Sequence, residues 1–92
     1  MITEVAELPD DFKKALSSGK LVYGIKSVLK EIKKGNVEKV IIASNIPSNY
    51  LDDLKRYSEI SNFEIIKYKG TNMELGVLCK RAHSVLAAAI VK

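Results

Sequence analysis

The sequence predicts an α/β domain of three layers, with helices on both faces of a largely parallel sheet. Segments with helical periodicity alternate with short β-type runs along the chain, which is typical of strands joined by crossover helices. One run, residues 40–43, is continuously apolar and rich in β-branched side chains, as expected of a strand buried on both faces. The 92 residues are enough for one domain, expected over residues 1–92, and too few for two.

The N-terminal part of the chain predicts two helices around a short strand. Residues 1–7 are expected to be an irregular lead-in, and the first helix then ends at Gly19, which is a typical C-terminal cap. Residues 20–23 are a strand candidate. A second helix is expected between Gly24 and Gly35, because apolar residues recur there at helical spacing. Its apolar stripe consists of Ile25, Val28, Leu29 and Ile32.

The rest of the chain continues the alternation. A strand over residues 39–43 is followed by a helix over 47–61 and a strand over 63–69. A tight turn at 70–74 leads into a fourth helix, which Thr71 or Asn72 can cap, and the final strand is expected over 84–91. One side of the third helix is expected to be buried: Tyr50, Leu51, Leu54, Tyr57 and Ile60.

The charge balance favours an anionic partner, though only mildly. Lys and Arg number 15 against 11 acidic residues, which gives a formal net charge of +4 and a pI near 9.2. An excess of lysine is also common on solvated helix faces. The distribution of the basic residues is therefore more informative than their total.

Several function classes are not expected. The longest apolar run, residues 85–91, is too short to span a bilayer, and the N-terminus does not resemble a secretory signal. The single cysteine, Cys79, favours a reducing compartment such as the cytoplasm. The sequence has no GxGxxG or P-loop motif, and one histidine with one cysteine cannot build a convincing metal site. We therefore expect a small basic binding domain without cofactor, rather than an enzyme.

Polar loops are expected to meet at one edge of the sheet. If the first three strands are parallel, their carboxyl ends bring together residues 24–27, 44–47 and 70–74. The loop at 80–83 joins them if the last strand runs antiparallel to its neighbour. Helix N-termini in such loops favour phosphate, and the amides of Asn45 and Asn72 can read base edges.

Each of these residues also has a purely structural interpretation. Gly24 is a turn residue, and Asn45 is a typical cap. Glu74 in a first helical turn is expected from capping alone. Lys26 differs, since a cation in a first turn opposes the helix dipole. His83 has no recognisable catalytic partner in the sequence, so a non-catalytic loop histidine is favoured.

Four segments carry a resemblance to a known family: residues 19–27 (GKLVYGIKS), 40–47 (VIIASNIP), 57–61 (YSEIS) and 70–76 (GTNMELG). In order and spacing they resemble the L30e family of large-subunit ribosomal proteins of archaea and eukaryotes, within the wider L7Ae group of kink-turn RNA binders. The resemblance runs from about residue 11 to residue 91. Lys26-Ser27 stand where the wider group carries Asn-Glu, which favours the ribosomal L30e branch.

The resemblance implies a three-layer α/β/α sandwich around a four-stranded mixed sheet, and a structural ribosomal protein that binds a kink-turn in rRNA. Gly24, Ile25 and Lys26 would face the tandem G·A pairs, and Asn45 and Asn72 would contact the bulge. The loop from Arg81 would pack on an extruded nucleotide, since unstacked bases are accessible to side chains. The RNA-binding residues expected on this basis are Gly24, Ile25, Lys26, Ser27, Lys30, Asn45, Pro47, Gly70, Thr71, Asn72, Glu74, Arg81, Ala82, His83 and Ser84.

The expected partners are rRNA and neighbouring ribosomal proteins, with no membrane contact and a monomer in the free state. The sequence ends at Lys92, whereas many members of the family continue with a short tail, so contacts of that tail are not carried over. Two alternatives remain. One is a non-ribosomal kink-turn binder in RNA processing or regulation. The other is a small nucleotide-binding enzyme or regulator that uses the turn at 70–74 as an anion site.

Overall fold

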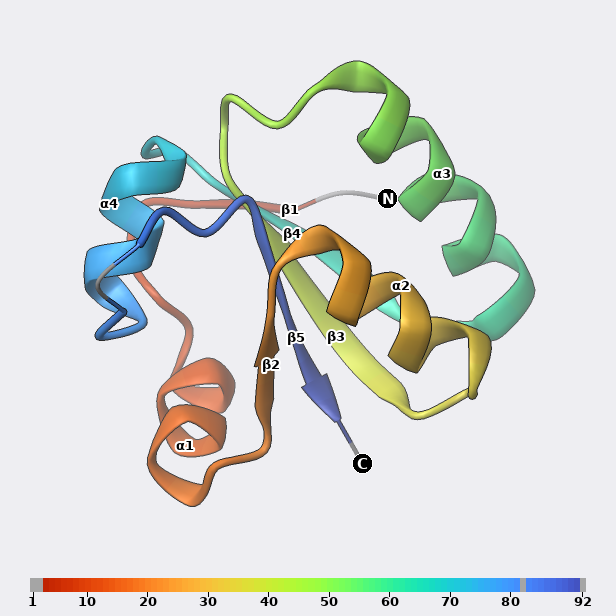
Figure 1. Ribbon diagram of the computed structural model, residues 1–92, viewed down its shortest axis with the longest axis horizontal. Coiled ribbons are helices and arrows are strands. Elements are labelled where there is room, and N and C mark those ends of the chain that lie inside the picture. Colours follow the sequence, from red (N-terminus) through yellow and green to blue (C-terminus); the bar gives the residue numbers. More distant parts are fainter. Residues whose placement is uncertain (1–2, 82, 92) are drawn as a thin grey trace.

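The computed structural model describes residues 3–81 and 83–91, and strands alternate with helices throughout this part of the chain (Figure 1). The strands are β1 (Thr3–Val5), β2 (Leu21–Tyr23), β3 (Val37–Ile42), β4 (Glu64–Tyr68) and β5 (Ala87–Val91). The helices are α1 (Asp10–Ser18), α2 (Ile25–Lys33), α3 (Ser48–Ser61) and α4 (Asn72–Leu78).

The strands form one mixed sheet in the order β1-β4-β3-β5-β2. The pairs β1–β4 and β4–β3 are parallel, whereas β5 is antiparallel to both of its neighbours, β3 and β2. It follows that β1, β2, β3 and β4 all point the same way and β5 points back. The predicted mixed α/β architecture is confirmed.

The helices cover the two faces of the sheet in pairs. Figure 1 shows α1 and α4 on one side and α2 and α3 on the other. Strand β3 alternates between the two layers: Val40 and Ile42 pack with side chains of α2 and α3, and Ile41 packs with Phe12 of α1 and Leu75 of α4. All five side chains are fully buried. The predicted burial of this strand on both faces is confirmed. Burial of its four-residue apolar run stabilises the packing of both helical layers on the sheet.

The sheet has five strands, whereas four were predicted. The additional strand is β1, which lies within the segment expected to be an irregular lead-in. Thr3 and Val5 align with Ile66 and Tyr68 of β4, in parallel register. Only three residues long and at the sheet edge, β1 has no apolar run of its own. Its hydrogen bonds depend on the otherwise open edge of β4.

Two further sequence predictions need correction. The last strand begins at Ala87 rather than at residue 84, so the loop before it is longer. Ile60, expected on the buried side of α3, is 72% exposed. Each step of three residues falls about 60° short of a full turn, so Ile60 lies about 120° around the helix from the buried Leu54. In the part of the chain that the structure describes, no helix is long and apolar enough to cross a membrane.

Candidate nucleic-acid interface

Four loops meet at one end of the sheet. The carboxyl ends of β2, β3 and β4 lie there because these strands run the same way, and the segment entering β5 lies there because β5 runs back. This is the convergence that the sequence predicts. We call it the loop edge and define it as residues 24–27, 44–47, 70–74 and 80–84, of which Ala82 lies outside the described residues.

Backbone hydrogen bonds connect the loops either directly or through residues 85–87, which lead into and begin β5. The Gly24 N–H donates to the Ala87 carbonyl (2.9 Å), which links the start of α2 to β5. The Ser44 N–H donates to the Gly70 carbonyl (3.0 Å), and the Val85 N–H donates to the Asn72 carbonyl (3.0 Å). The loop edge is therefore one connected surface rather than four independent loops.

Asn45 and Asn72 bond to each other across the loop edge. The Asn45 side-chain amide donates to Asn72 Oδ1 (2.8 Å), and the Asn72 backbone N–H donates to Asn45 Oδ1 (2.9 Å). Both were predicted as site residues, but sequence reasoning missed their pairing. An asparagine side chain has two N–H donors and one carbonyl oxygen with two lone pairs. The two asparagines together therefore retain N–H donors that can bind a ligand.

Thr71 and Glu74 have a local structural role at the start of α4. The Glu74 N–H donates to Thr71 Oγ1 (3.4 Å) and the Thr71 N–H donates to Glu74 Oε1 (3.5 Å). This reciprocal arrangement is a capping box, which satisfies two N–H groups at the helix start. The predicted capping by Thr71 is confirmed, and the Glu74 carboxylate is engaged in it.

Glycine is needed at two positions at or next to the loop edge, for a different reason at each. Gly24 has φ +88°, a conformation that side chains other than glycine rarely adopt, and it turns the chain from β2 into α2. At Gly76, a residue outside the predicted site, a Cβ atom would overlap the main-chain oxygen of His83. A glycine inside a helix lowers its intrinsic stability, so its presence in α4 was a usable sequence signal for this contact.

Arg81 stacks on an aromatic ring that sequence reasoning placed in the core or at its rim. Its guanidinium lies 4.6 Å from the ring centroid of Tyr23, at the end of β2. Tyr23 is partly buried, and burial raises the pKa of its hydroxyl, so the ring is neutral near pH 7. The contact holds a cation of the α4–β5 loop against the strand that leads into Gly24 and Lys26.

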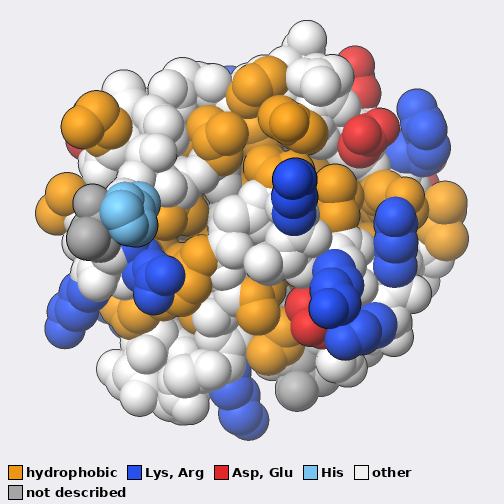
Figure 2. Space-filling view, in the orientation of Figure 1, with side chains coloured by type: hydrophobic (Ala, Val, Ile, Leu, Met, Phe, Trp, Pro, Cys, Tyr) orange, Lys and Arg blue, Asp and Glu red, His pale blue; other side chains and the backbone are white. Residues whose placement is uncertain are grey.

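The remaining site residues of this surface are mostly exposed. Lys26, Ser27 and Lys30 lie exposed along the first turns of α2, and His83 and Ser84 lie exposed in the α4–β5 loop. Figure 2 shows the histidine on the open surface with basic side chains beside it, and further Lys and Arg side chains gathered over α2. Ile25 and Gly70 are partly buried and Pro47, the residue before α3, is exposed.

The loop edge presents mainly amide and basic groups. Among residues 3–81 and 83–91, no group of three or more His, Cys, Asp or Glu side chains could hold a metal ion. The predicted core position of Cys79 is confirmed, since it is 1% exposed. Burial raises the pKa of its thiol, which disfavours the nucleophilic thiolate. What the edge presents is amides, exposed cations and a stacked arginine.

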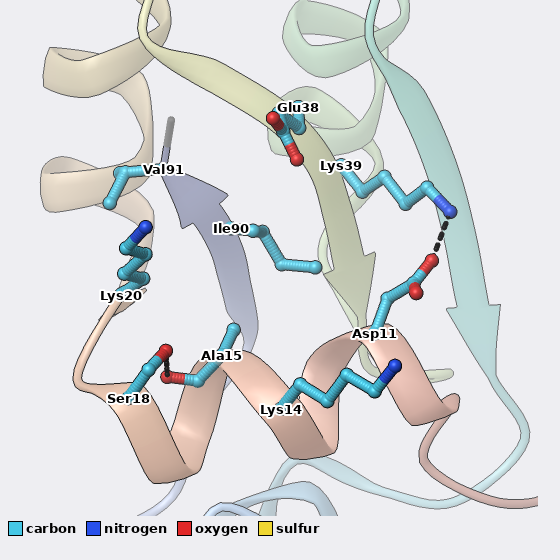
Figure 3. A pocket seen from close by; sticks show the side chains of 9 residues that line it. All are labelled: Asp11, Lys14, Ala15, Ser18, Lys20, Glu38, Lys39, Ile90 and Val91. Carbon is cyan, nitrogen blue, oxygen red and sulfur yellow. Dashed lines mark hydrogen bonds and ion pairs between the residues drawn. The ribbon is translucent and has the colours of Figure 1, made fainter.

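A separate hollow lies at the opposite end of the sheet, between α1 and the strands β3 and β5 (Figure 3). Its volume is about 420 Å³. Its charges are mixed, and Lys39 bonds directly to Asp11 across it. None of the predicted RNA-binding residues lines it, so it is unrelated to the loop edge. Its lining residues are Asp11, Lys14, Ala15, Ser18, Lys20, Glu38, Lys39, Ile90 and Val91.

The three-layer fold and its amide- and lysine-bearing edge define a small α/β domain whose polar loops meet at one end of the sheet. The chain belongs to the ribosomal protein L7Ae/L30e/S12e/Gadd45 family, whose model matches residues 6–92. The resemblance noted in the sequence is thus confirmed.

Curated relatives of high coverage carry ribosomal names. The large ribosomal subunit protein eL30 of Archaeoglobus fulgidus is 40% identical over 88 residues, covering 96% of this chain and 98% of the relative. The eL30 protein of Sulfurisphaera tokodaii is 34% identical over 90 residues, covering 98% and 85%. These relatives are ribosomal proteins, a non-enzymatic class, in agreement with the prediction that the chain is not an enzyme.

Solved structures support the same fold. The Giardia lamblia 15.5kD RNA binding protein superposes with a TM-score of 0.77 at 26% identity, covering 87% of this chain and 67% of that chain. A protein of unknown function from Bacillus halodurans superposes with a TM-score of 0.76 at 19% identity, covering 85% and 77%, which shows a shared fold alone.

Proposed function

We propose that this chain is a protein of the large ribosomal subunit that binds a kink-turn in ribosomal RNA through its loop edge. The observation that carries the proposal is the joining of four polar loops into one surface that includes Lys26 and the Asn45–Asn72 pair. The names of the archaeal relatives support the ribosomal assignment, and the name of the Giardia protein supports RNA as the ligand.

The chemistry of the loop edge suits a bent RNA. Exposed lysines attract phosphate, and the asparagine amides and the Arg81–Tyr23 stack present donors and a flat cation to splayed bases. A regular A-form duplex hides its base edges in a deep major groove, so a kinked loop is the more accessible target. The RNA-binding set proposed is the one predicted from the sequence. We also propose that residues 1–92 form one domain and that the free protein is a monomer. We propose that it resides in cytoplasmic ribosomes, where it contacts neighbouring ribosomal proteins.

A pair of lysine variants on the same helix tests the proposal. Lys26→Ala removes a cation at the loop edge, whereas Lys34→Ala removes one at the far end of α2, where Lys34 pairs with Glu31 at 3.8 Å. We expect Lys26→Ala to weaken binding to a kink-turn RNA roughly tenfold, the equivalent of one charge-assisted contact of about 1.4 kcal/mol. Lys34→Ala should change affinity little. Equal small effects of both variants would contradict the proposed interface.

The sedimentation of the protein distinguishes the ribosomal proposal from a kink-turn binder in RNA processing. A ribosomal protein is expected to travel with the large subunit through a sucrose gradient of a cell lysate and to be released at high salt. Recovery of the protein mainly in light fractions, with retained kink-turn binding in vitro, would favour the processing role instead.

A further inference from the structure

A groove with an apolar lining lies between α1, the end of α4 and the segment that joins β1 to α1. Its volume is about 580 Å³. Leu8, Leu16 and Leu78 line it, and all three belong to or pack against the core cluster shared by α1 and α4. Leu16 and Leu78 are only partly buried, so this core layer opens to the surface here. We call it the α1–α4 groove, lined by residues 6–8, Lys13, Leu16, Ser17, Leu78 and Lys80.

The exposed side of α4 adds further apolar surface. Met73 and Val77 are 71% and 74% exposed, and their spacing of four residues places them on one side of the helix. Val77 precedes the groove residue Leu78, and Met73 lies in the loop edge. Large apolar side chains that gather on a surface are typical of a site that another protein covers, and methionine is enriched in such interfaces. Leucine side chains, in contrast, offer nothing to the phosphates of a nucleic acid.

Lys80 is held beside the groove in a backbone conformation that lysine rarely adopts. Its φ is +56°. The Lys80 N–H donates to the Val77 carbonyl (3.0 Å), and the Arg81 N–H donates to the Gly76 carbonyl (2.9 Å). These two bonds form a Schellman motif, in which the left-handed position is usually glycine and sometimes asparagine. A side chain destabilises this conformation, so the lysine is present against the local preference and a use for its ammonium group is indicated.

The charge changes along the groove. An adjoining hollow of about 540 Å³ shares residues 6–8 and Lys13 with the groove and continues to Asp10. Asp10 therefore lies at one end of this elongated surface and Lys80 at the other, with Glu7 and Lys13 between them. The ion pairs found among the described residues involve neither of these two lysines. The elongated shape suits a segment of chain, and the charge at the α4 end favours a carboxylate.

We propose that the α1–α4 groove is the docking site for an extended segment of another protein. The segment places aliphatic side chains over Leu8, Leu16 and Leu78, and one of its carboxylates pairs with Lys80. Because Lys80 belongs both to the groove and to the loop edge, this partner sits beside the proposed RNA site. The inference goes beyond the proposed function, since this docking needs no RNA.

Random peptides displayed on phage are the probe for this site. The full-length chain is panned against the library, and the enriched peptides are synthesised with a fluorescent label so that anisotropy gives their dissociation constants. Ser17→Glu adds a carboxylate within the groove. Ser18→Glu makes the same change on the next residue of α1, which lines the separate hollow at the far end of the sheet. Thermal melting of each variant checks that the fold is retained.

We expect the enriched peptides to combine aliphatic side chains with carboxylates. Ser17→Glu should weaken their binding about fivefold, because like charges are then brought together, and Ser18→Glu should bind like the wild type. Lys80→Gln should weaken binding about threefold, as for one partly exposed ion pair. Lys55→Gln, the same change on an exposed residue of α3, should have no effect.

Lys80→Gly separates binding from stability. Glycine adopts the left-handed conformation without strain, so this variant should melt a few degrees above the wild type. It should nevertheless bind the peptides as weakly as Lys80→Gln does. A purely structural role of Lys80 would not produce this combination.

Several results would overturn the inference. They include no enriched peptide, enriched peptides without carboxylates, and equal affinities of Ser17→Glu and Ser18→Glu for the peptides. A dimer in solution that Ser17→Glu dissociates would make the occupant a second copy of this chain. A loss of affinity for a kink-turn RNA in Ser17→Glu alone would make it RNA. The proposed function fails separately, if the wild type does not prefer a kink-turn RNA over a straight duplex of equal length.

Discussion

At the scale of single residues, Arg81 is held at the loop edge by the ring of Tyr23. The guanidinium stands 4.6 Å from the ring centroid, and the Arg81 N–H donates to the Gly76 carbonyl (2.9 Å). A cation already held in place loses less conformational freedom when it meets a ligand. Tyr23 therefore acts on the proposed RNA contact through Arg81, as a positioning residue.

This role predicts coupling between the two side chains. Tyr23→Leu removes the ring, and we expect it to weaken kink-turn RNA binding about threefold, in line with a partly exposed cation–π contact of about 0.5–1 kcal/mol. Tyr23→Phe keeps the ring and should bind like the wild type. In an Arg81→Gln background, Tyr23→Leu should have no further effect. Dissociation constants of the single and double variants measure the coupling, and additive losses would mean that Tyr23 acts independently of Arg81.

Sequence reasoning found individual residues of the loop edge but not their partners. Asn45 and Asn72 stand out in sequence because each follows a strand or opens a helix. Their reciprocal hydrogen bonds depend on two loops that meet only after β3 and β4 pair. The contact between Tyr23 and Arg81 was likewise not predicted. A tyrosine in a strand is expected in the core or at its rim unless its neighbours in space are known.

At the scale of elements, an ion pair fastens α1 to the sheet. Asp11, in the first turn of α1, bonds to Lys39 of β3 across the hollow at the far end of the sheet (Figure 3). The hydrogen bond from Lys39, followed by its charge, lowers the pKa of Asp11. The hydrogen bond to Asp11 in turn raises the pKa of Lys39. The pair therefore stabilises the folded state only while both groups are charged.

The pH dependence of stability tests this pair. Because the pKa of Asp11 is lower in the folded than in the unfolded chain, its contribution is complete above its ordinary pKa of about 3.9 and is lost as pH falls through the folded value. Asp11→Asn should melt at a lower temperature than Asp10→Asn at pH 7, since Asp10 is exposed in the same helical turn and makes the matched charge change. The two melting temperatures should converge only once the pH has fallen below the lowered folded pKa of Asp11.

Melting curves followed by circular dichroism across pH 2–7 would measure both variants. A constant difference between Asp11→Asn and Asp10→Asn over the whole range would contradict a titrating pair. At alkaline pH the stability contributed by the pair is lost as pH rises rather than as it falls. The pKa of Lys39 is raised in the folded state, so its contribution persists until pH rises through that folded value.

The predictability of an element depended on how much of its own sequence enters the core. Strand β3 was predicted because Val40, Ile41 and Ile42 are all buried, so the whole run is apolar. Strand β1 was not predicted because it is held by backbone pairing with β4 at the sheet edge. Its three residues are too few to show the hydrophobic pattern of a strand. Ile60 was misplaced because a three-residue spacing was followed past the width of the buried stripe of α3.

At the scale of the whole molecule, the alternation of strands and helices predicted the layers but not the strand order. The order β1-β4-β3-β5-β2 places the antiparallel β5 between β3 and β2. Alanines at positions 87–89 of β5 are fully buried, and their small side chains let both helical layers approach the sheet there. The strand order depends on packing between segments that are distant in the chain. It therefore cannot be predicted from any single segment.

This architecture predicts that RNA stabilises the entire fold. Four loops from strands across the sheet share the edge through hydrogen bonds, so a ligand that binds there requires the folded arrangement of β2, β3, β4 and β5. At a free kink-turn RNA concentration about 100 times Kd, the free energy of unfolding should rise by about 2.7 kcal/mol. For a chain of this size, that corresponds to a rise in melting temperature of about 10–20 °C.

Tyrosine fluorescence can follow this melting, since the chain has four tyrosines and no tryptophan. A straight duplex of equal length, at the same concentration, should raise the melting temperature much less, because it offers phosphates without the splayed bases that the loop edge is proposed to bind. Mononucleotides should have no effect. Stabilisation by a mononucleotide but not by the kink-turn RNA would contradict RNA binding and favour the turn at 70–74 as a nucleotide site.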